Sequence, residues 1–431
     1  MDALIPFDYA TLRVVWWVLL GALLIGFAVM DGFDLGVAAL LPLVAKTDVE
    51  RRVVINVVGP VWEGNQVWLI TAGGAIFAAW PLLYAASFSG FYLAMMLALI
   101  ALILRPVGFK YRSKMEGTRW RNTWDGVLCF SGVVASLVFG VAVGNIILGV
   151  PFTFDEAALR MVYQGHFYQL FTPFALLAGV LSVAMLAMHG AVLLAWRTEG
   201  VVASRARNWG RLCALLTAAL FVAGGFWVAG GLNGHVITSA VDMQGPSDPM
   251  LKTVSVQAGA WMANYAKWPL MWIAPALGVA GALLALLLLT ARAHMLAFLA
   301  SALSIAGIIL TAGFSLFPFL MPSSSNPRAG LTVWDASSSH MTLWIMVIAV
   351  AIFLPIVTLY TAWVYRVMRG KVTPESVGGT PTHTESGASA MWYFSWVLGL
   401  GLACAFAILN AMWFELREGH SHDPRAKRDE A

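Results

Sequence analysis

Two carboxylates interrupt an otherwise apolar segment, which reads Gly26-Phe27-Ala28-Val29-Met30-Asp31-Gly32-Phe33-Asp34-Leu35-Gly36. The segment lies inside the apolar stretch 14–45. At about 1.5 Å per residue, this stretch is long enough to cross roughly 30 Å of hydrocarbon. An ionised carboxylate is costly in lipid, so such residues usually face a partner, a cavity or a proton path. The stretch therefore predicts a membrane helix with a polar role.

Similar apolar segments recur along the whole chain. Of the 431 residues, 60% are hydrophobic and only 11% are charged, which excludes a soluble fold. Ten segments are long enough to span a membrane: 14–45, 52–80, 82–106, 125–149, 166–197, 212–232, 268–291, 294–321, 341–367 and 391–414. The predicted fold class is all-α integral membrane, with about nine transmembrane helices and a linked tenth.

The distribution of Lys and Arg predicts how these helices are oriented. We count Arg105 and Lys110 with the loop that follows the third span. The loops after odd-numbered spans then hold 17 basic residues. The N-terminal leader and the loops after even-numbered spans hold 5. The positive-inside rule therefore places the odd loops in the cytoplasm and the N-terminus outside.

Three acids are expected to share one depth in the membrane. Asp31 and Asp34 lie about 20 Å and about 16 Å from the inner end of the first predicted helix, and Glu63 lies roughly 17 Å from the inner end of the second. A short loop joins these helices, so they are expected to pack antiparallel. The i, i+3 spacing puts Asp31 and Asp34 on one face. We therefore expect an acid cluster near the midplane.

The residues around Glu63 suggest a proton path. Two amides accompany this acid in a segment where side chains able to hold water are otherwise rare. The predicted path, open to the cytoplasm, comprises Asp31, Asp34, Glu63, Trp62, Asn65 and Gln66. The alternative is that the acids cap backbone groups or pair with basic residues of a partner subunit, which would only fix assembly. The sequence leaves both open.

Residues that could ligate a metal are few in the apolar segments. Only His166, His189, His294 and His340 lie in or beside predicted spans. His189 alone is well inside one, and we expect it to be packed or hydrogen-bonded. The three cysteines lack the spacing of a metal site or a covalent haem. The chain is therefore expected to hold no haem or metal by itself.

Several motifs resemble the subunit II family of cytochrome bd quinol oxidases. They are residues 26–36, quoted above, and the run Trp62-Glu63-Gly64-Asn65-Gln66-Val67-Trp68-Leu69-Ile70-Thr71-Ala72-Gly73-Gly74. The likeness continues through Arg105-Pro106-Val107-Gly108-Phe109, Tyr111-Arg112-Ser113-Lys114, Arg119-Trp120-Arg121-Asn122, Phe317-Pro318-Phe319-Leu320-Met321-Pro322-Ser323-Ser324 and Trp334-Asp335-Ala336. It covers residues 7 to about 370.

The resemblance implies a heterodimer with subunit I, which holds haems b and d and oxidises quinol while O2 is reduced to water. It implies two four-helix bundles and one peripheral helix for spans one to nine. It also implies that the acids matching Asp31 and Glu63 serve a proton path from the cytoplasm, although some members carry Asp at the position of Glu63. Some members hold a quinone within subunit II, for which the sequence assigns no residues.

The C-terminal part of the chain predicts a further unit after the subunit II-like domain, residues 1–369. Residues 370–390 are rich in Gly, Pro, Ser and Thr and predict a flexible linker. Residues 391–414 resemble the start of the small accessory subunit X of the same oxidase, and 415–431 form a polar tail. By that resemblance, Glu415 would lie near a haem of the partner. Natural and engineered fusion both fit, and the alternative is an ordinary tenth helix packed on the ninth.

The predicted function is that of a subunit of a terminal respiratory oxidase in the bacterial cytoplasmic (inner) membrane, not catalytic alone. The chain would scaffold subunit I and contribute a proton path, with quinol and O2 as substrates of the complex and no nucleic-acid partner. Midplane acids would also suit a proton-coupled transporter, although the sequence shows no broken helices in paired repeats. A third possibility is an assembly scaffold alone.

Overall fold

The computed structural model describes residues 5–155 and 160–378. Its long helices are α1 (Tyr9–Val44), α6 (Tyr92–Tyr111), α7 (Thr118–Leu148), α8 (Pro173–Arg197), α9 (Gly200–Gly231), α11 (Ile273–Thr290), α12 (His294–Leu316) and α13 (His340–Val367). The shorter α-helices are α2 (Asp48–Val58), α3 (Trp62–Asn65), α4 (Val67–Ala79), α5 (Pro81–Gly90), α10 (Ala263–Lys267) and α14 (Pro374–Gly378). Short 3-10 helices cover Arg112–Lys114, Phe167–Leu170, Pro249–Leu251, Ala260–Met262, Pro269–Trp272 and Pro327–Ala329.

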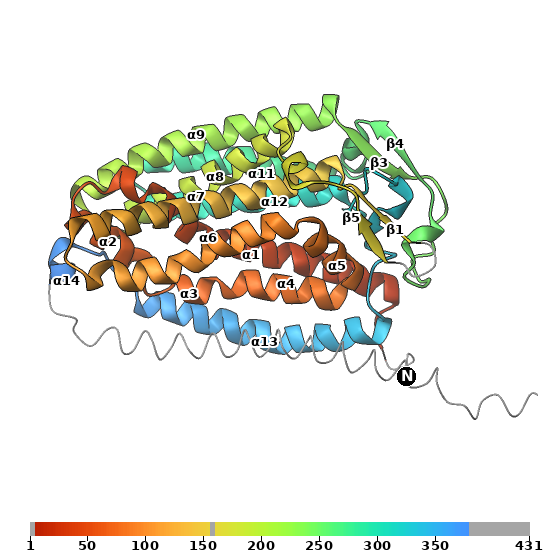
Figure 1. Cartoon of the computed structure of the whole chain (residues 1–431), viewed down its shortest axis with the longest axis horizontal. Coiled ribbons are helices and arrows are strands. Elements are labelled where there is room, and N and C mark those ends of the chain that lie inside the picture. The colour runs from red at the N-terminus through yellow and green to blue at the C-terminus, as the bar shows by residue number, and fades with distance from the viewer. Residues whose placement is uncertain (1–4, 156–159, 379–431) are drawn as a thin grey trace, which may run out of the picture.

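The long helices run side by side, and three two-stranded antiparallel hairpins gather at one end of the bundle (Figure 1). The hairpins pair β1 (Phe152–Phe154) with β2 (Met161–Tyr163), β3 (Asn233–Ile237) with β4 (Val254–Ala258), and β5 (Phe319–Met321) with β6 (Leu331–Thr332). Within the described residues, eight helices are long and apolar enough to cross a membrane. The all-α membrane fold class is therefore confirmed.

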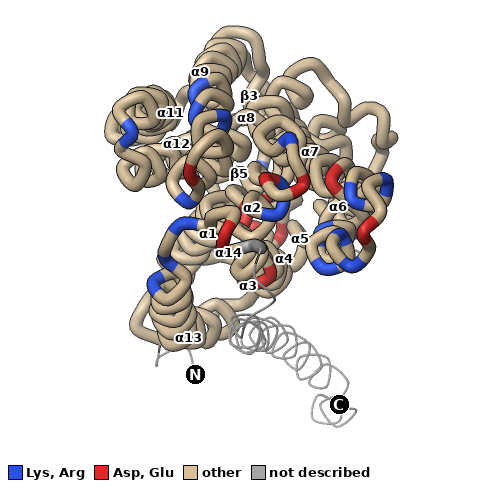
Figure 2. Tube along the Cα trace, turned by 90° about the vertical axis from the view of Figure 1, so that its left-hand side faces the viewer, with Lys and Arg blue, Asp and Glu red and all other residues tan. Residues whose placement is uncertain are grey.

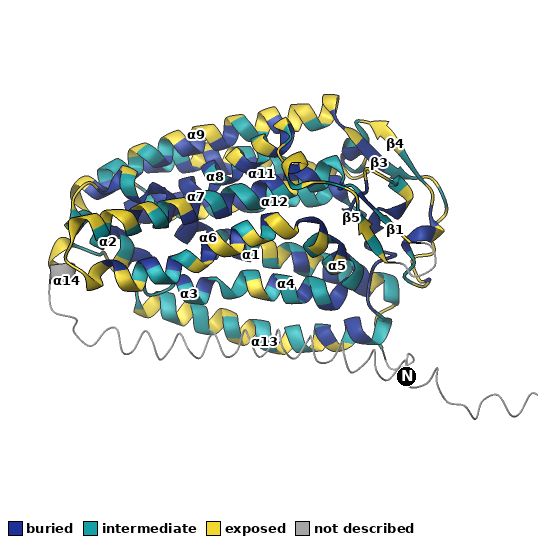
Figure 3. Cartoon of the chain, viewed as in Figure 1, coloured by how far each residue is buried: buried dark blue, intermediate teal, exposed yellow. Residues whose placement is uncertain are grey.

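The helix contacts form two groups. In the first, α1 packs on α4 and α7, and α7 packs on α6; in the second, α8 packs on α9 and α12, and α11 packs on α9 and α12. The two groups are joined because α8 also packs on α1 and α7. Helix α13 lies at the side of the first group and is little buried: Thr342, Leu343 and Met346 are its buried residues, and the others are half-buried or exposed (Figure 3). This arrangement matches the two four-helix bundles and the peripheral helix that the resemblance implied.

The second and third predicted spans differ from expectation, because neither is one continuous helix. Residues 52–80 form α2, α3 and α4, which are separated at Gly59–Val61 and at Gln66. Pro60 has no N–H to donate to the preceding turn, so α2 ends before it. In the third span, α5 and α6 meet at Phe91, and α6 then continues through Pro106 to Tyr111. The break at Gly59–Val61 places Glu63 in a separate single turn.

Helices α1 and α8 approach so closely that their backbones touch at glycines. A Cβ added at Gly36 would overlap the carbonyl oxygen of Leu186, and one added at Gly190 would overlap the backbone of Gly36 and Val37. Small residues at such crossings let membrane helices pack by dispersion forces. This contact holds the two bundles together and buries the half of α1 that carries the acids.

Buried Arg13 fixes the opposite end of α1 to the loops beside the hairpins. Its Nε donates to Ser337 Oγ over 2.7 Å, and its Nη1 donates to the carbonyl oxygen of Met243 over 2.7 Å. Its guanidinium carbon also lies 3.6 Å from the centroid of the Tyr9 ring. This arginine therefore stabilises the fold and does not contact solvent.

The described part of the predicted linker, residues 370–378, is held against the bundle. The amide of Val372 donates to Arg197 O over 2.8 Å, Lys371 Nζ lies 2.8 Å from Glu199 Oε1, and α14 contacts α2. These described positions contact the bundle, and the flexibility of the linker stays a prediction. The rest of the linker, the tenth predicted helix and the polar tail lie outside the described residues and stay predictions.

Replacing Gly36 by Ala tests the helix contact. We expect α1 and α8 to separate, at a cost of about 3 kcal/mol or more, because the added methyl group meets backbone rather than a movable side chain. The measurement is the thermal unfolding midpoint of the chain in detergent and its yield from membranes. Gly21→Ala on the same helix is the control, since a Cβ there meets nothing within 4 Å. Equal behaviour of the two variants would contradict the packing described.

Candidate functional site

Asp31 forms a fully buried ion pair with Arg105. Arg105 Nη1 and Nη2 both lie 3.0 Å from Asp31 Oδ1, and Nη2 also lies 3.0 Å from Oδ2. Neither side chain is exposed. The indole of Trp62 lies against this pair, with the Arg105 guanidinium 6.0 Å from its ring centroid, and packs on Phe109. Asp31 thus faces a counter-charge from α6 inside its own chain.

Asp34, one turn further along α1, has neutral partners. Asn65 Nδ2 donates to Asp34 Oδ2 over 2.8 Å, and the Tyr365 hydroxyl donates to Asn65 Oδ1 over the same distance. Asp34 is fully buried, and its Oδ1 has no hydrogen-bond partner among the described residues. A chain of hydroxyl, amide and carboxyl groups therefore runs from α13 to α1 and ends at one unpaired oxygen.

Glu63 occupies a more open position. Its Oε1 lies 3.2 Å from Lys110 Nζ, near the end of α6. The Glu63 side chain is 16% exposed and that of Lys110 is 60% exposed, so solvent reaches this pair. No direct hydrogen bond joins Glu63 to Asp31 or Asp34 among the described contacts, although Asn65 follows two residues later in the same turn.

The predicted set is brought together in part. Asp31, Asp34, Trp62 and Asn65 form one buried group, with Glu63 beside it at the more exposed edge. Gln66 is half-buried at the start of α4 and makes no side-chain hydrogen bond within the described residues. Glu415 lies outside the part of the chain that the structure describes.

Three residues of this group were not predicted as part of the site. Arg105 and Lys110 were assigned to a cytoplasmic loop, but both lie within α6. The clue in the sequence was that the apolar pattern continues past Arg105 through Val107 and Phe109. Tyr365 had no such signal, because it stands 300 residues from Asn65 in the chain.

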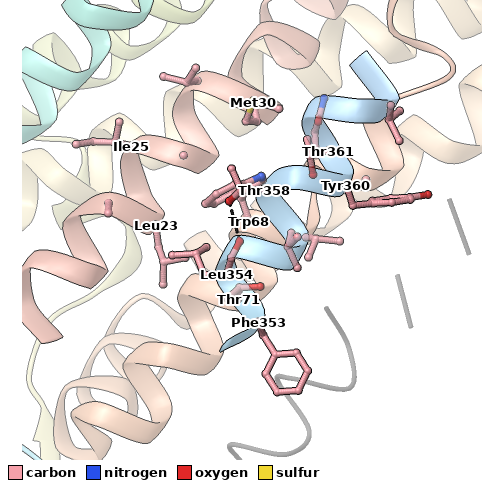
Figure 4. A pocket seen from close by; sticks show the side chains of 18 of the residues that line it. Leu23, Ile25, Met30, Trp68, Thr71, Phe353, Leu354, Thr358, Tyr360 and Thr361 are labelled. Carbon is pink, nitrogen blue, oxygen red and sulfur yellow. Dashed lines mark hydrogen bonds between the residues drawn. The ribbon is translucent and has the colours of Figure 1, made fainter. Parts of the chain in front are cut away.

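An apolar cavity of about 580 Å³ adjoins this group between α1, α4 and α13. Figure 4 shows Leu23 and Met30 of α1, Trp68 of α4 and Thr358 of α13 on its walls. The Thr358 hydroxyl donates to Leu354 O within its own helix, so it offers the cavity no free donor. Asn65 and Tyr365 also line the space. The cavity therefore has long apolar walls and a polar edge at the acid group.

His189 is fully buried and uses both ring nitrogens, as the prediction of a hydrogen-bonded histidine expected. Nδ1 lies 2.7 Å from Ser301 Oγ, and Nε2 lies 3.1 Å from Val29 O. The described residues contain no group of three or more His, Cys, Asp or Glu that could hold a metal ion. His189 thus joins α8 to α1 and α12.

The sequence and the fold match known proteins over most of the chain. Residues 12–368 match the family model described as cytochrome bd terminal oxidase subunit II, and residues 391–417 match that of a membrane bound YbgT-like protein. The fold is similar to a chain in the structure of bd oxidase from Geobacillus thermodenitrificans, with a TM-score of 0.60 and 19% identity, covering 83% of this chain and 99% of that one. That likeness concerns the fold alone.

Relatives are found for both parts of the chain. Cytochrome bd-I ubiquinol oxidase subunit 2 of Escherichia coli strain K12 is 51% identical over 370 residues, which cover 86% of this chain and 97% of that protein. Cytochrome bd ubiquinol oxidase subunit X of Brucella abortus is 57% identical over 42 residues, or 9% of this chain and 82% of that protein. This multi-pass bacterial membrane chain therefore belongs to the cytochrome bd terminal oxidase subunit II family, as one subunit of a quinol oxidase, and ends in a segment similar to subunit X.

Proposed function

We propose that this chain supplies a proton path from the cytoplasm to a haem-bearing subunit I and serves as its scaffold, within a complex that oxidises quinol and reduces O2. The observation that carries the proposal is the unequal pairing of the three acids. Asp31 has a full counter-charge, Asp34 has an unpaired buried oxygen, and Glu63 is open to solvent. These are the properties of an anchor, a relay and an entry point.

The orientation rests on the basic residues. Lys and Arg gather on the end of the bundle that carries α2 and α14, which Figure 2 views directly. The α1 helix begins at the opposite end, beside the hairpins (Figure 1). With the positive-inside rule, this supports a cytoplasmic α2 end, an external N-terminus and residence in the cytoplasmic membrane of a bacterium.

The proposed path enters at Glu63 and continues to Asp34. Lys110 keeps Glu63 near solvent, and the turn that contains Glu63 also supplies Asn65, which bonds Asp34. An amide cannot easily release a proton, so we assign Asn65 to positioning and assign proton exchange to the carboxyl groups and to water between them. The unpaired Oδ1 of Asp34 is where such water would bind.

Asp31 has a different role in this proposal. A carboxylate that shares both oxygens with a buried guanidinium stays charged, because protonating it would leave Arg105 without compensation. The alternative reading of the acids as structural anchors therefore fits Asp31, with the counter-charge in the same chain rather than in a partner subunit.

The proposed cofactors are divided between the two subunits, with the haems in subunit I and a quinone in this chain. Haems b and d belong to subunit I in this proposal; among the described residues, His189 lies deep in the bundle and already uses both its ring nitrogens. A quinone fits the cavity beside α13, whose apolar walls suit a prenyl chain and whose polar edge at Asn65 and Tyr365 suits a carbonyl oxygen. Such a molecule would fill apolar space and stabilise the position of α13.

Broken helices, which a transporter would use in paired repeats, do occur in α2–α6. Membership of the oxidase family nevertheless favours the oxidase subunit over a proton-coupled transporter. The remaining alternative is a subunit that only supports assembly and conducts no protons, and mutations can distinguish it from the proposed proton path.

Glu63→Gln tests the entry point. We expect quinol-dependent oxygen uptake by the purified complex to fall by roughly 10²-fold, the lower end of what a positioned proton-transfer group contributes, with unchanged haem content. Glu50→Gln is the matched control, because Glu50 pairs with Arg205 at the surface away from the acid group. Loss of haem in the Glu63→Gln complex would instead support scaffolding alone.

Asp31→Asn and Asp34→Asn should separate anchor from relay. Asp31→Asn leaves Arg105 buried without its partner, which costs about 3–5 kcal/mol and should lower the thermal midpoint of the complex. Asp34→Asn removes no counter-charge and should lower oxygen uptake with little change in that midpoint. Asp31→Leu combined with Arg105→Met should recover most of the lost stability. The assignment fails if Asp34→Asn is the less stable of the two single variants.

A further inference from the structure

Three arginines and a histidine converge where α9 meets the turn between α11 and α12. Arg207 and Arg211 lie on one face of α9 at i, i+4 spacing, Arg292 lies in the turn, and His294 begins α12. The charged groups that act on Arg207 are Arg211 and Arg292, and those that act on His294 include Arg207 and Arg292. Every one of these charged neighbours is an arginine, so the surroundings of Arg207 and His294 are locally positive.

Several other basic residues at this end of the bundle have acidic partners. Arg112 pairs with Asp125 and Asp48, and Arg205 pairs with Glu50. In contrast, no described carboxylate forms an ion pair with Arg207, Arg211 or Arg292. Figure 2 shows the corresponding basic segments on α9 and beside α11 and α12. The positive charge is thus concentrated and uncompensated.

Two donors or acceptors inside this group are buried without a partner. They are Nε of Arg211 and Nδ1 of His294, neither of which has a hydrogen-bond partner among the described residues. A buried polar atom without a partner is destabilising. An anion bound at the accessible groups of the same cluster would compensate the positive charge around both nitrogens.

The backbone at Arg292 is a second sign of function. Arg292 has φ 58°, the left-handed region, two residues past the end of α11. Glycine is the residue that suits this position, since a side chain there is strained. The chain instead has Arg292 at this position, which adds a third arginine to the group.

The outer surface below the cations is aliphatic. Leu212 and Leu215 of α9, Leu287 of α11, and Met295 and Leu299 of α12 are all exposed. At the far end of these helices the exposed residues include four aromatic ones: Phe226 and Trp227 of α9, and Trp268 and Trp272 just before α11. Aromatic residues at one interface and cations at the other are typical of a surface that faces lipid.

We propose that Arg207, Arg211, Arg292 and His294 bind the phosphate group of an anionic phospholipid, whose acyl chains lie along the exposed aliphatic residues of α9, α11 and α12. Basic pockets between helix ends bind lipid headgroups by this chemistry. The aliphatic surface favours lipid over a soluble phosphate, and the aromatic residues at its far end favour lipid over a protein partner. The site is independent of the proton path.

The test uses the complete oxidase complex in nanodiscs of phosphatidylcholine, with or without a minor fraction of phosphatidylglycerol, and native mass spectrometry to count retained lipids. Each cation near an anionic headgroup contributes roughly fivefold in affinity, so Arg207→Gln with Arg211→Gln should weaken phosphatidylglycerol retention about 25-fold. Lys114→Gln with Arg119→Gln removes the same charge from exposed, unpaired positions at the same end and should change retention little.

Arg292→Gly separates binding from folding. Glycine suits the left-handed backbone, so the thermal midpoint in pure phosphatidylcholine should be unchanged or higher, while phosphatidylglycerol retention falls about fivefold. Equal retention by wild type and all variants would overturn the proposal. So would stabilisation by inorganic phosphate equal to that by phosphatidylglycerol, which would indicate a soluble anion. Loss of the partner subunit in the arginine variants would indicate a protein interface and also overturn it.

Discussion

The ion pair between Asp31 and Arg105 is the constraint around which the first bundle is arranged. A carboxylate at membrane depth is tolerated when it is compensated, and here a guanidinium from α6 compensates it within the same chain. Trp62 covers the guanidinium, and the α1–α8 contact at Gly36 and Gly190 closes the other side of α1. Close backbone packing and charge neutralisation therefore depend on each other.

The polar group beside that pair is built from elements that a regular helix could not bring together. The break before α3 turns Glu63 toward Lys110 while Asn65, in the same turn, reaches Asp34. Tyr365 then connects the group to the peripheral helix α13 across the edge of the cavity. Glu63, Asp34 and the apolar cavity thus meet at one short irregular segment, and the irregularity is what makes the arrangement possible.

Apolar length predicted the fold well, and the site only in part. The helices α1, α7, α8, α9 and α11–α13 correspond to seven predicted spans, because each is one long apolar run. The breaks in α2–α6 were missed, since Gly59, Pro60 and Phe91 change the chain path without interrupting the hydropathy.

The acids were predicted from their cost in lipid; among their partners Asn65 was predicted as well, but Arg105, Lys110 and Tyr365 were not. Arg105 stands at the edge of an apolar run, where charge counting assigns a cation to a loop, and only the continuation of α6 shows otherwise. Tyr365 meets Asn65 through tertiary packing alone, across a separation that no local pattern encodes.

The internal pairing of Asp31 bears on how the oxidase is made. A polypeptide whose deepest charge is already neutralised by its own third apolar segment can leave the translocon and settle in the bilayer before it meets subunit I. Cellular quality control would then act on the association of two fully inserted subunits, rather than on a partly inserted chain that needs its partner subunit to complete insertion.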